Sequence, residues 1–220
     1  AFRARIDAMK ARIACEQRLR QTLIGGIFCT EEGRYPEGSL EQAYDDCKAN
    51  DHIMQAMLEE EGLRERELVK LVEASPVYQR LFEPIEGVGP LIAVRLLVTI
   101  GDIRRFSTDA KLKAFLGVHV LAGGKYADVP AEKSFPRQRS KSADWPYASN
   151  WHPDGRQALY LLADQFNRRP NSEWGQKLLH YKEHFRTQHP QVEMTAGGKK
   201  RYKDGHILKM ALWRTLTKFV

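Results

Sequence analysis

A short glycine-rich turn, Gly87-Val88-Gly89, followed by Pro90 and an apolar stretch, is the feature of this sequence best suited to bind a ligand. Glycine has no Cβ and readily adopts positive φ, so the turn is tight and its backbone can approach a ligand closely. Proline at the first helical position loses no hydrogen bond there. The unpaired amides of the first helical turn and the positive end of the helix dipole favour a phosphate oxygen. The pattern is typical of a helix-hairpin-helix, which contacts a nucleic-acid backbone; a plain turn between two packed helices is the alternative.

Basic side chains suited to hold phosphates gather in the second half of the chain. With 35 Lys and Arg against 28 Asp and Glu, the formal net charge is +7, which favours a polyanionic partner. The candidate DNA-contacting residues besides the turn are Arg95, Arg137, Arg139, Lys141, Lys199, Lys200 and Arg201. Tyr202 follows the last of these and is expected to stack on an exposed base. Solvated basic faces and a plain linker are the alternative interpretations.

Cysteine spacing and hydropathy exclude several protein classes. Cys15, Cys29 and Cys47 form no Cys-x-x-Cys pair and have no histidine cluster at zinc spacing, so neither a disulfide framework nor a structural metal is predicted. No apolar run approaches the roughly 20 residues of a membrane span, and no signal peptide opens the chain. We therefore expect a cytoplasmic, nucleoid-associated protein without a membrane partner. Because the chain begins at Ala1 inside a helical pattern, we expect a fragment or a processed product.

A long helical arm is predicted for residues 1–75. Positions 40, 44, 47, 51, 54, 58, 61, 65, 68 and 72 alternate in steps of four and three, which is a heptad seam with several charged members. A similar apolar stripe begins at Phe2 and is expected to end at Gly25-Gly26. The sequence predicts two antiparallel long helices joined by residues 30–38. Such a coiled-coil arm serves dimerisation or spacing rather than chemistry.

Residues 76–220 are predicted to form a helical domain around the glycine-rich turn. Short helices are expected on both sides of the turn, over Val77–Phe82 and Pro90–Ile100. Later helices are expected over Ala110–Leu116, where Ser107-Thr108-Asp109 offers an N-cap, and over Arg156–Asn167, Glu173–Thr187 and Ile207–Phe219. Residues 117–155 lack periodicity, and long polar loops of this kind usually carry function. Strand patterns are nearly absent, so the predicted fold class is all-α.

These pieces, taken in order, resemble the C-terminal domain of the IS-one-ten family of insertion-sequence transposases, relatives of the Piv DNA invertase. The resemblance runs from about Pro84 to the end of the chain, and a coiled arm precedes this domain in that family. The segments that carry it are Ile85–Pro90, Ile100–Phe106, Lys111–Val118, Arg156–Tyr160 and Ser172–Gly175.

The resemblance implies a serine nucleophile that attacks DNA and a separate RNase-H-like domain whose acidic residues bind Mg²⁺. No counterpart of that metal-binding domain is present here, so no cofactor is expected in this chain, and alone it is expected to be inactive. The family pattern has a Ser-Gly in the loop that this chain lacks. Counting back from Arg156 makes Ser134 the nucleophile candidate, with Ser140 second, whereas a different alignment places Asp128 there. His152 is a candidate general base, and a capping or solvent-facing histidine is the alternative.

Two functions are consistent with these patterns. The first is the DNA-binding half of a transposase or recombinase that works as a homo-oligomer on DNA, with a structured non-coding RNA as a further partner suggested by the resemblance. The second is a non-catalytic helix-hairpin-helix module that tethers a partner to DNA through its coiled arm. Both use the glycine-rich turn and the basic half, so only the serine separates them.

Overall fold

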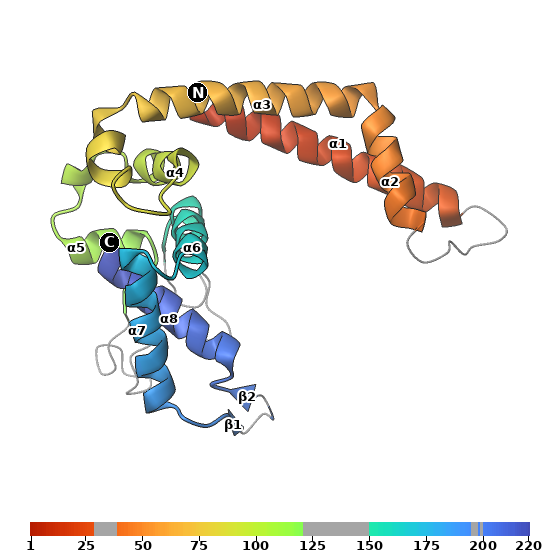
Figure 1. Cartoon of the computed structure of the whole chain (residues 1–220). Coiled ribbons are helices and arrows are strands. Elements are labelled where there is room, and N and C mark those ends of the chain that lie inside the picture. The colour runs from red at the N-terminus through yellow and green to blue at the C-terminus, as the bar shows by residue number, and fades with distance from the viewer. Residues whose placement is uncertain (29–38, 121–149, 195–197, 199) are drawn as a thin grey trace. The chain divides into compact units, whose positions relative to one another are not determined.

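The computed structural model describes residues 1–28, 39–120, 150–194, 198 and 200–220 (Figure 1). Within these residues the fold is all-α, with one short strand pair beside the helices. The chain divides into two compact units, Ala1–Ser75 and Pro76–Val220. In the described residues no helix is both long enough and apolar enough to cross a membrane.

The described part of the first unit consists of α1 (Phe2–Phe28), α2 (Ser39–Asn50) and α3 (His52–Glu73). Helix α1 packs along α3, and the pairing of Arg5 with Glu65 and of Arg12 with Glu61 shows that the two helices run antiparallel, as predicted. The prediction that Gly25 and Gly26 end the first helix is wrong, because α1 continues through both to Phe28. A helical glycine costs only about 1 kcal/mol relative to alanine, which its neighbours can offset.

The predicted continuous seam after residue 40 is interrupted at Asp51. Its side chain accepts a hydrogen bond from the Met54 amide at 2.7 Å and caps the N-terminus of α3. A carboxylate at this position satisfies an amide that would otherwise have no partner. The heptad pattern therefore spans two helices, α2 and α3, rather than one.

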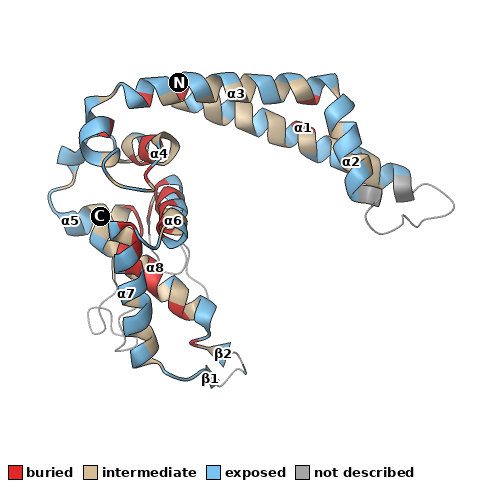
Figure 2. Cartoon of the chain, viewed as in Figure 1, coloured by how far each residue is buried: buried red, intermediate tan, exposed pale blue. Residues whose placement is uncertain are grey.

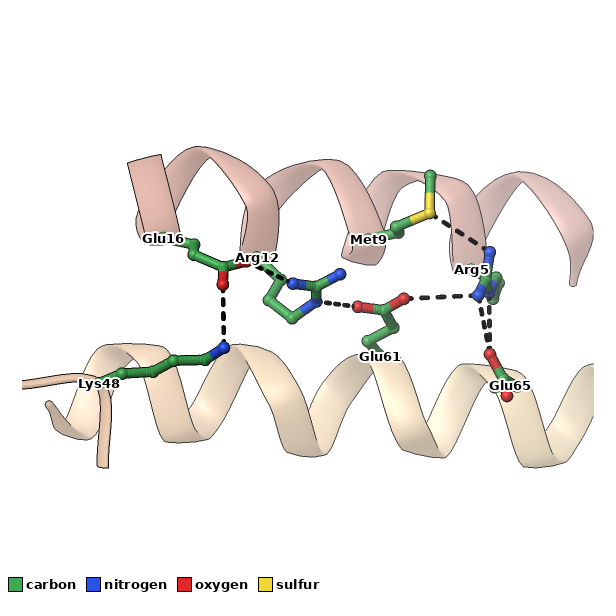
Figure 3. Close-up of polar contacts among 7 residues, drawn as sticks. All are labelled: Arg5, Met9, Arg12, Glu16, Lys48, Glu61 and Glu65. Carbon is green, nitrogen blue, oxygen red and sulfur yellow. Dashed lines mark hydrogen bonds and ion pairs between the residues drawn. The ribbon is translucent and has the colours of Figure 1, made fainter. Parts of the chain in front are cut away.

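The seam between α1 and α3 is held by ion pairs as well as by apolar contacts (Figure 3). The buried apolar residues of α3 are Met54, Leu68 and Val72. Between them, the Glu61 side chain is only 13% exposed and pairs with both Arg5 and Arg12 of α1. Two charged members of the heptad pattern, Glu61 and Glu65, are thus matched by arginines of the opposite helix.

A second polar contact joins α1 to α2. Glu16 accepts hydrogen bonds from Lys48 at 2.9 Å and from Tyr44 at 3.0 Å, and Arg12 reaches the same carboxylate at 2.8 Å. The hydrogen bond from Lys48 lowers the pKa of Glu16. Opposite charges within hydrogen-bond distance favour the ionised form.

The second unit begins with a short π-helix and then alternates helices with turns. Its elements in the described residues are η1 (Tyr78–Phe82), α4 (Pro90–Ile100), η2 (Ile103–Arg105), α5 (Asp109–Phe115), α6 (Pro153–Arg168), α7 (Glu173–Gln188), β1 (Glu193–Met194), β2 (Lys200–Arg201) and α8 (Asp204–Phe219). The strands pair antiparallel, Glu193 opposite Arg201 and Met194 opposite Lys200. Helix α4 has the predicted bounds.

Local sequence explains where several of these helices begin. The Thr108 hydroxyl accepts from the Lys111 amide at 3.3 Å and starts α5, as predicted. The Ser172 hydroxyl accepts from the Gly175 amide at 3.1 Å and starts α7. Hydroxyl side chains at the N-cap satisfy amides that the helix itself leaves without partners.

The core of the second unit lies between α4, α6 and α8, where buried residues concentrate (Figure 2). Leu159, Leu162 and Phe166 of α6 are fully buried, and Ile207 and Leu216 of α8 are buried with them. The spacing of the α6 residues places them on one helical face. This core fixes the ends of α6 and thereby the surroundings of the glycine-rich turn.

Candidate nucleic-acid interface

The turn between η1 and α4 takes its shape mainly from Gly87. This residue has a φ of +98°, a conformation that other residues rarely adopt. Gly89 does not use positive φ, because it has φ −74° and ψ 164° and is the N-cap of α4. An added Cβ at Gly89 would meet no atom within 4 Å. Gly89 therefore leaves open space at the start of the helix.

Several amides of the turn and of the start of α4 have no hydrogen-bond partner in the described part of the chain. Val88 is buried and its amide donates to the Ile85 carbonyl at 3.0 Å, which closes the turn. Among the described residues, the amides of Gly87, Gly89 and Leu91 donate to no carbonyl or side chain. Gly89 is exposed and Gly87 and Leu91 are partly exposed. Unpaired amides at a helix N-terminus favour an anionic ligand.

The turn rests on the C-terminal end of α6. A Cβ at Gly87 would lie 3.3 Å from Gln165 Cβ, 3.6 Å from a ring carbon of Phe166 and 3.8 Å from Arg169 Cδ. The Arg169 guanidinium is held by the Gln165 side chain at 2.5 Å. A cation that the sequence analysis did not single out is thus placed beside the turn.

The other predicted DNA-contacting residues fall into two groups. Arg95 on α4 is partly exposed and has no ion pair or side-chain hydrogen bond within the described residues, whereas Lys200 and Arg201 form β2. Outside the described residues lie the predicted contacts Arg137, Arg139, Lys141 and Lys199, and also the nucleophile candidates Ser134, Ser140 and Asp128.

The expectation that Tyr202 stacks on an exposed base is wrong. Tyr202 is only 4% exposed, and its ring lies parallel to that of His189, with 3.7 Å between centroids. The ring of His206 lies on it as well, at 5.4 Å, and the His206 Nδ1 accepts from the Tyr202 amide. The histidines occupy the ring, so Tyr202 closes the end of the helix pair α7 and α8.

His152 lies at the N-cap of α6 without capping it through its side chain. Its amide donates to the Phe115 carbonyl at 2.7 Å, and its ring lies 5.4 Å from the Phe115 ring. Its Nδ1 atom is buried and has no hydrogen-bond partner among the described residues. An imidazole nitrogen without a partner is open to a hydrogen bond from a group that approaches it.

Arg156 contacts residues at both ends of the segment 119–150. Its guanidinium lies between two indole rings, 4.1 Å from the Trp151 centroid and 4.3 Å from that of Trp213. It also donates to the Gly117 carbonyl at 2.8 Å. Burial lowers the pKa of Arg156 to about 10, so it is still a cation at neutral pH.

The segment's first end is fixed by further contacts. The Thr217 hydroxyl of α8 donates to the Val118 carbonyl at 2.7 Å. Gly117 has a φ of +72°, and an added Cβ would lie 2.9 Å from atoms of both Trp151 and Arg156. Burial, and then the charge of Arg156, lower the pKa of His119. The positions 115–119 and 151–156 are therefore fixed side by side on the core.

Residues 79–122 match the family described as Transposase IS116/IS110/IS902 family. The matched residues begin in η1, contain the glycine-rich turn and α4, and extend past α5. The match covers about a fifth of the chain and supports a role in transposition. It assigns this segment to the IS116/IS110/IS902 family and so confirms there the resemblance drawn from the sequence. No curated protein matches the chain.

Sequence reasoning overlooked Arg156 and Arg169 as positioned cations. Arg156 entered the sequence analysis only within the segment Arg156–Tyr160. The contact of its guanidinium with Trp151 and Trp213 gives no local signal in the sequence, because Trp213 lies on the distant helix α8. The second cation, Arg169, lies just after a predicted helix. It lies close to Gly87 because the turn packs against α6.

Proposed function

We propose that this chain is the DNA-engaging half of the transposase and that its glycine-rich turn works as a helix-hairpin-helix. In this proposal the amides of Gly89 and Leu91 bind a phosphate oxygen of the DNA backbone. The observation that carries it is that Gly89 is exposed, Leu91 is partly exposed, and neither amide has a partner within the described ranges. The Arg169 side chain beside the turn adds positive charge. Contacts of this kind hold the backbone without reading the base sequence.

We further propose that the segment between His119 and Trp151 supplies the serine nucleophile, Ser134 first and Ser140 second. The Oγ would attack a DNA phosphorus and displace a sugar oxygen, which requires a base for the serine proton and cations around the phosphoryl group. His152 is the proposed base, supported by its unpaired Nδ1 at the edge of the segment. Arg137, Arg139 and Lys141 are the proposed cations.

Any metal chemistry is likewise a matter of proposal. In the described residues no group of three or more His, Cys, Asp or Glu side chains is placed to hold a metal ion. We propose that Mg²⁺ is bound by an RNase-H-like domain outside this chain. We also propose that the active assembly is a homo-oligomer on DNA, with a structured RNA as a further partner.

Two glycine variants test the role of the turn in binding. Gly89→Ala should leave the free energy of unfolding within about 1 kcal/mol of wild type, because its φ suits alanine and the space is open. It should weaken binding to unrelated duplexes about tenfold, because a methyl group there obstructs close approach of a phosphate. Gly87→Ala should instead destabilise the fold by about 1–3 kcal/mol, since its φ is positive.

Binding is measured by fluorescence anisotropy with duplexes of two unrelated sequences over a range of salt concentrations. Wild-type affinity should fall steeply with salt, and Gly89→Ala should weaken binding with little change of this slope, because the amides of the turn are uncharged and release no counterion. Unchanged affinity in a stably folded Gly89→Ala protein would show that the turn does not contact DNA.

The serine is tested in the complete transposase with Mg²⁺ and a donor DNA. A covalent protein–DNA adduct should form and should be lost in Ser134→Ala. An adduct that persists in both Ser134→Ala and Ser140→Ala contradicts both assignments. If wild type forms no adduct, the non-catalytic tethering module gains support.

A further inference from the structure

A second surface of the helical domain combines aromatic rings with basic side chains. A groove of about 520 Å³ runs along α7 and reaches Lys218 of α8. Its lining includes Trp174, Lys177, His180 and Tyr181 of α7. This surface contains none of the residues of the glycine-rich turn.

The two large rings of the groove lie on one face of α7. Trp174 and Tyr181 are seven residues apart, which is two helical turns, so they share a face with about 10 Å between them along the axis. Single-stranded DNA rises about 3.4 Å per nucleotide when its bases are stacked. A ligand that covers both rings is therefore a strand of several nucleotides rather than a single nucleotide.

The rings of Trp174 and Tyr181 each lie near a basic side chain. One side of Trp174 stacks on the buried Phe166, with 5.8 Å between centroids, and the Lys177 Nζ lies 4.0 Å above the ring. The Arg214 guanidinium lies 5.9 Å from the Tyr181 ring. Because Lys177 is a flexible, partly exposed side chain, it can move from the ring to a phosphate while a base takes its place.

The charge of the groove is complementary to a polyanion. Lys177, Lys218 and Arg214 are basic, and the carboxylate of Glu173 is the acidic group among the lining residues. Glu173 is already paired with Lys177 at 2.6 Å. Lys218 is exposed and has no ion pair within the described residues. Aromatic rings beside basic side chains are the usual combination for binding single strands without sequence preference.

We propose that the groove along α7 binds an unpaired stretch of DNA, with bases stacked on Trp174 and Tyr181 and phosphates on Lys177 and Lys218. The proposal rests on the proposed DNA-engaging role of the chain and adds a single-strand site to it. The bases of an intact duplex are stacked on one another and do not present their faces to such rings. The groove therefore favours DNA that is opened, as it is during strand exchange.

The test compares two double variants of the full chain that carry the same net charge. Lys177→Gln with Lys218→Gln removes both groove lysines, whereas Lys182→Gln with Lys209→Gln removes exposed lysines of the same two helices outside the groove. Anisotropy with labelled dT12 should show about tenfold weaker binding for the groove variant and less than about twofold for the control. The salt slope of the groove variant should fall by about 1.4, twice the value of 0.7 for a single-strand phosphate.

A third variant tests stacking separately from charge. Wild type should bind dT12 at least about fivefold more tightly than an abasic strand of equal length, because each base stacked on an aromatic ring contributes about 1–3 kcal/mol. In Tyr181→Leu this ratio should shrink towards one. Binding of a 12-base-pair duplex should stay within about twofold of wild type in all three variants.

Distinct outcomes separate this proposal from that for the turn. Equal losses in the groove and control variants, or an unchanged ratio in Tyr181→Leu, would overturn the groove assignment while leaving duplex binding by the turn intact. Binding of U12 at least tenfold tighter than that of dT12 would also overturn it, because the occupant would then be RNA. Loss of duplex binding in Gly89→Ala with normal dT12 binding would support two separate sites.

Discussion

The shared carboxylate of Glu61 makes the interface between α1 and α3 open to a precise test. Its side chain is 13% exposed and contacts Arg12 and, at 3.5 Å, Arg5 (Figure 3). Glu61→Gln keeps the shape of the side chain and removes its charge. The change therefore isolates the electrostatic contribution of one position in the seam.

The size of the effect follows from the partners that remain. A hydrogen bond to a charged group contributes about 1.5–3 kcal/mol, and breaking a fully buried ion pair costs about 3–5 kcal/mol. After the substitution Arg5 still pairs with Glu65 and Arg12 with Glu16, so neither arginine loses all its partners. Glutamine also retains one acceptor oxygen. We expect the free energy of unfolding of the first unit to fall by about 2 kcal/mol.

Two optical probes separate the effect on the first unit from any effect on the second. All four tryptophans lie in residues 76–220, so their fluorescence reports the second unit, whereas far-UV circular dichroism reports helices of both. In urea, Glu61→Gln should lower the dichroism midpoint for the first unit and leave the tryptophan transition unchanged. The matched control is Glu60→Gln, whose 44% exposed carboxylate pairs with Arg64 four residues along the same helix.

The control should cost less than about 0.5 kcal/mol, because exposed i,i+4 pairs contribute little. Its effect should also disappear in 0.5 M NaCl, whereas that of Glu61→Gln should largely remain, since salt screens partly buried pairs less. Equal losses for the two variants would refute the argument that partial burial strengthens the Glu61 contacts. A parallel shift of the tryptophan transition would refute the expectation that the two units unfold separately.

Two further predictions concern the second unit. Gly175→Ala should destabilise the second unit by about 3 kcal/mol, because an added Cβ would lie 1.9 Å from the Arg169 carbonyl oxygen. In the control Gly205→Ala, in α8, the added Cβ meets no atom within 4 Å, so this change should be neutral or stabilising by up to about 1 kcal/mol. Urea denaturation followed by tryptophan fluorescence measures both, and equal effects would contradict the prediction. The pKa of His119 is lowered first by burial and then by Arg156, so below its ordinary value of about 6.5 the unfolded chain binds a proton that the folded chain does not. The free energy of unfolding should therefore fall as the pH is lowered from 7 to 5, and His119→Gln should flatten this fall; an unchanged slope would remove His119 as its source.

Local signals in the sequence predicted the helical elements well. The bounds of α4 follow from Pro90 at its start and Gly101 at its end, and the hydroxyl of Thr108 fixes the start of α5. These features depend on residues within one helical turn of each other. The all-α fold class follows from the same kind of signal, the periodic apolar face.

Features that depend on contacts between distant segments could not be predicted. The heptad seam gave no sign that Glu61 and Glu65 would meet arginines, because the register of α1 against α3 is set by packing along both helices. Tyr202 was expected to be available for stacking, but His189 and His206 cover its ring. The proposed site gained Arg169 only because the turn packs on the end of α6.

The contacts at the ends of segment 119–150 have a consequence for how much its length can vary. Hydrogen bonds to the carbonyls of Phe115, Gly117 and Val118 join the entry of this segment to its exit and to α8. Once the two ends are joined, doubling the number of residues between them adds only about 0.6 kcal/mol of closure entropy. A longer or shorter stretch here should therefore cost little stability while the surrounding helices keep their packing.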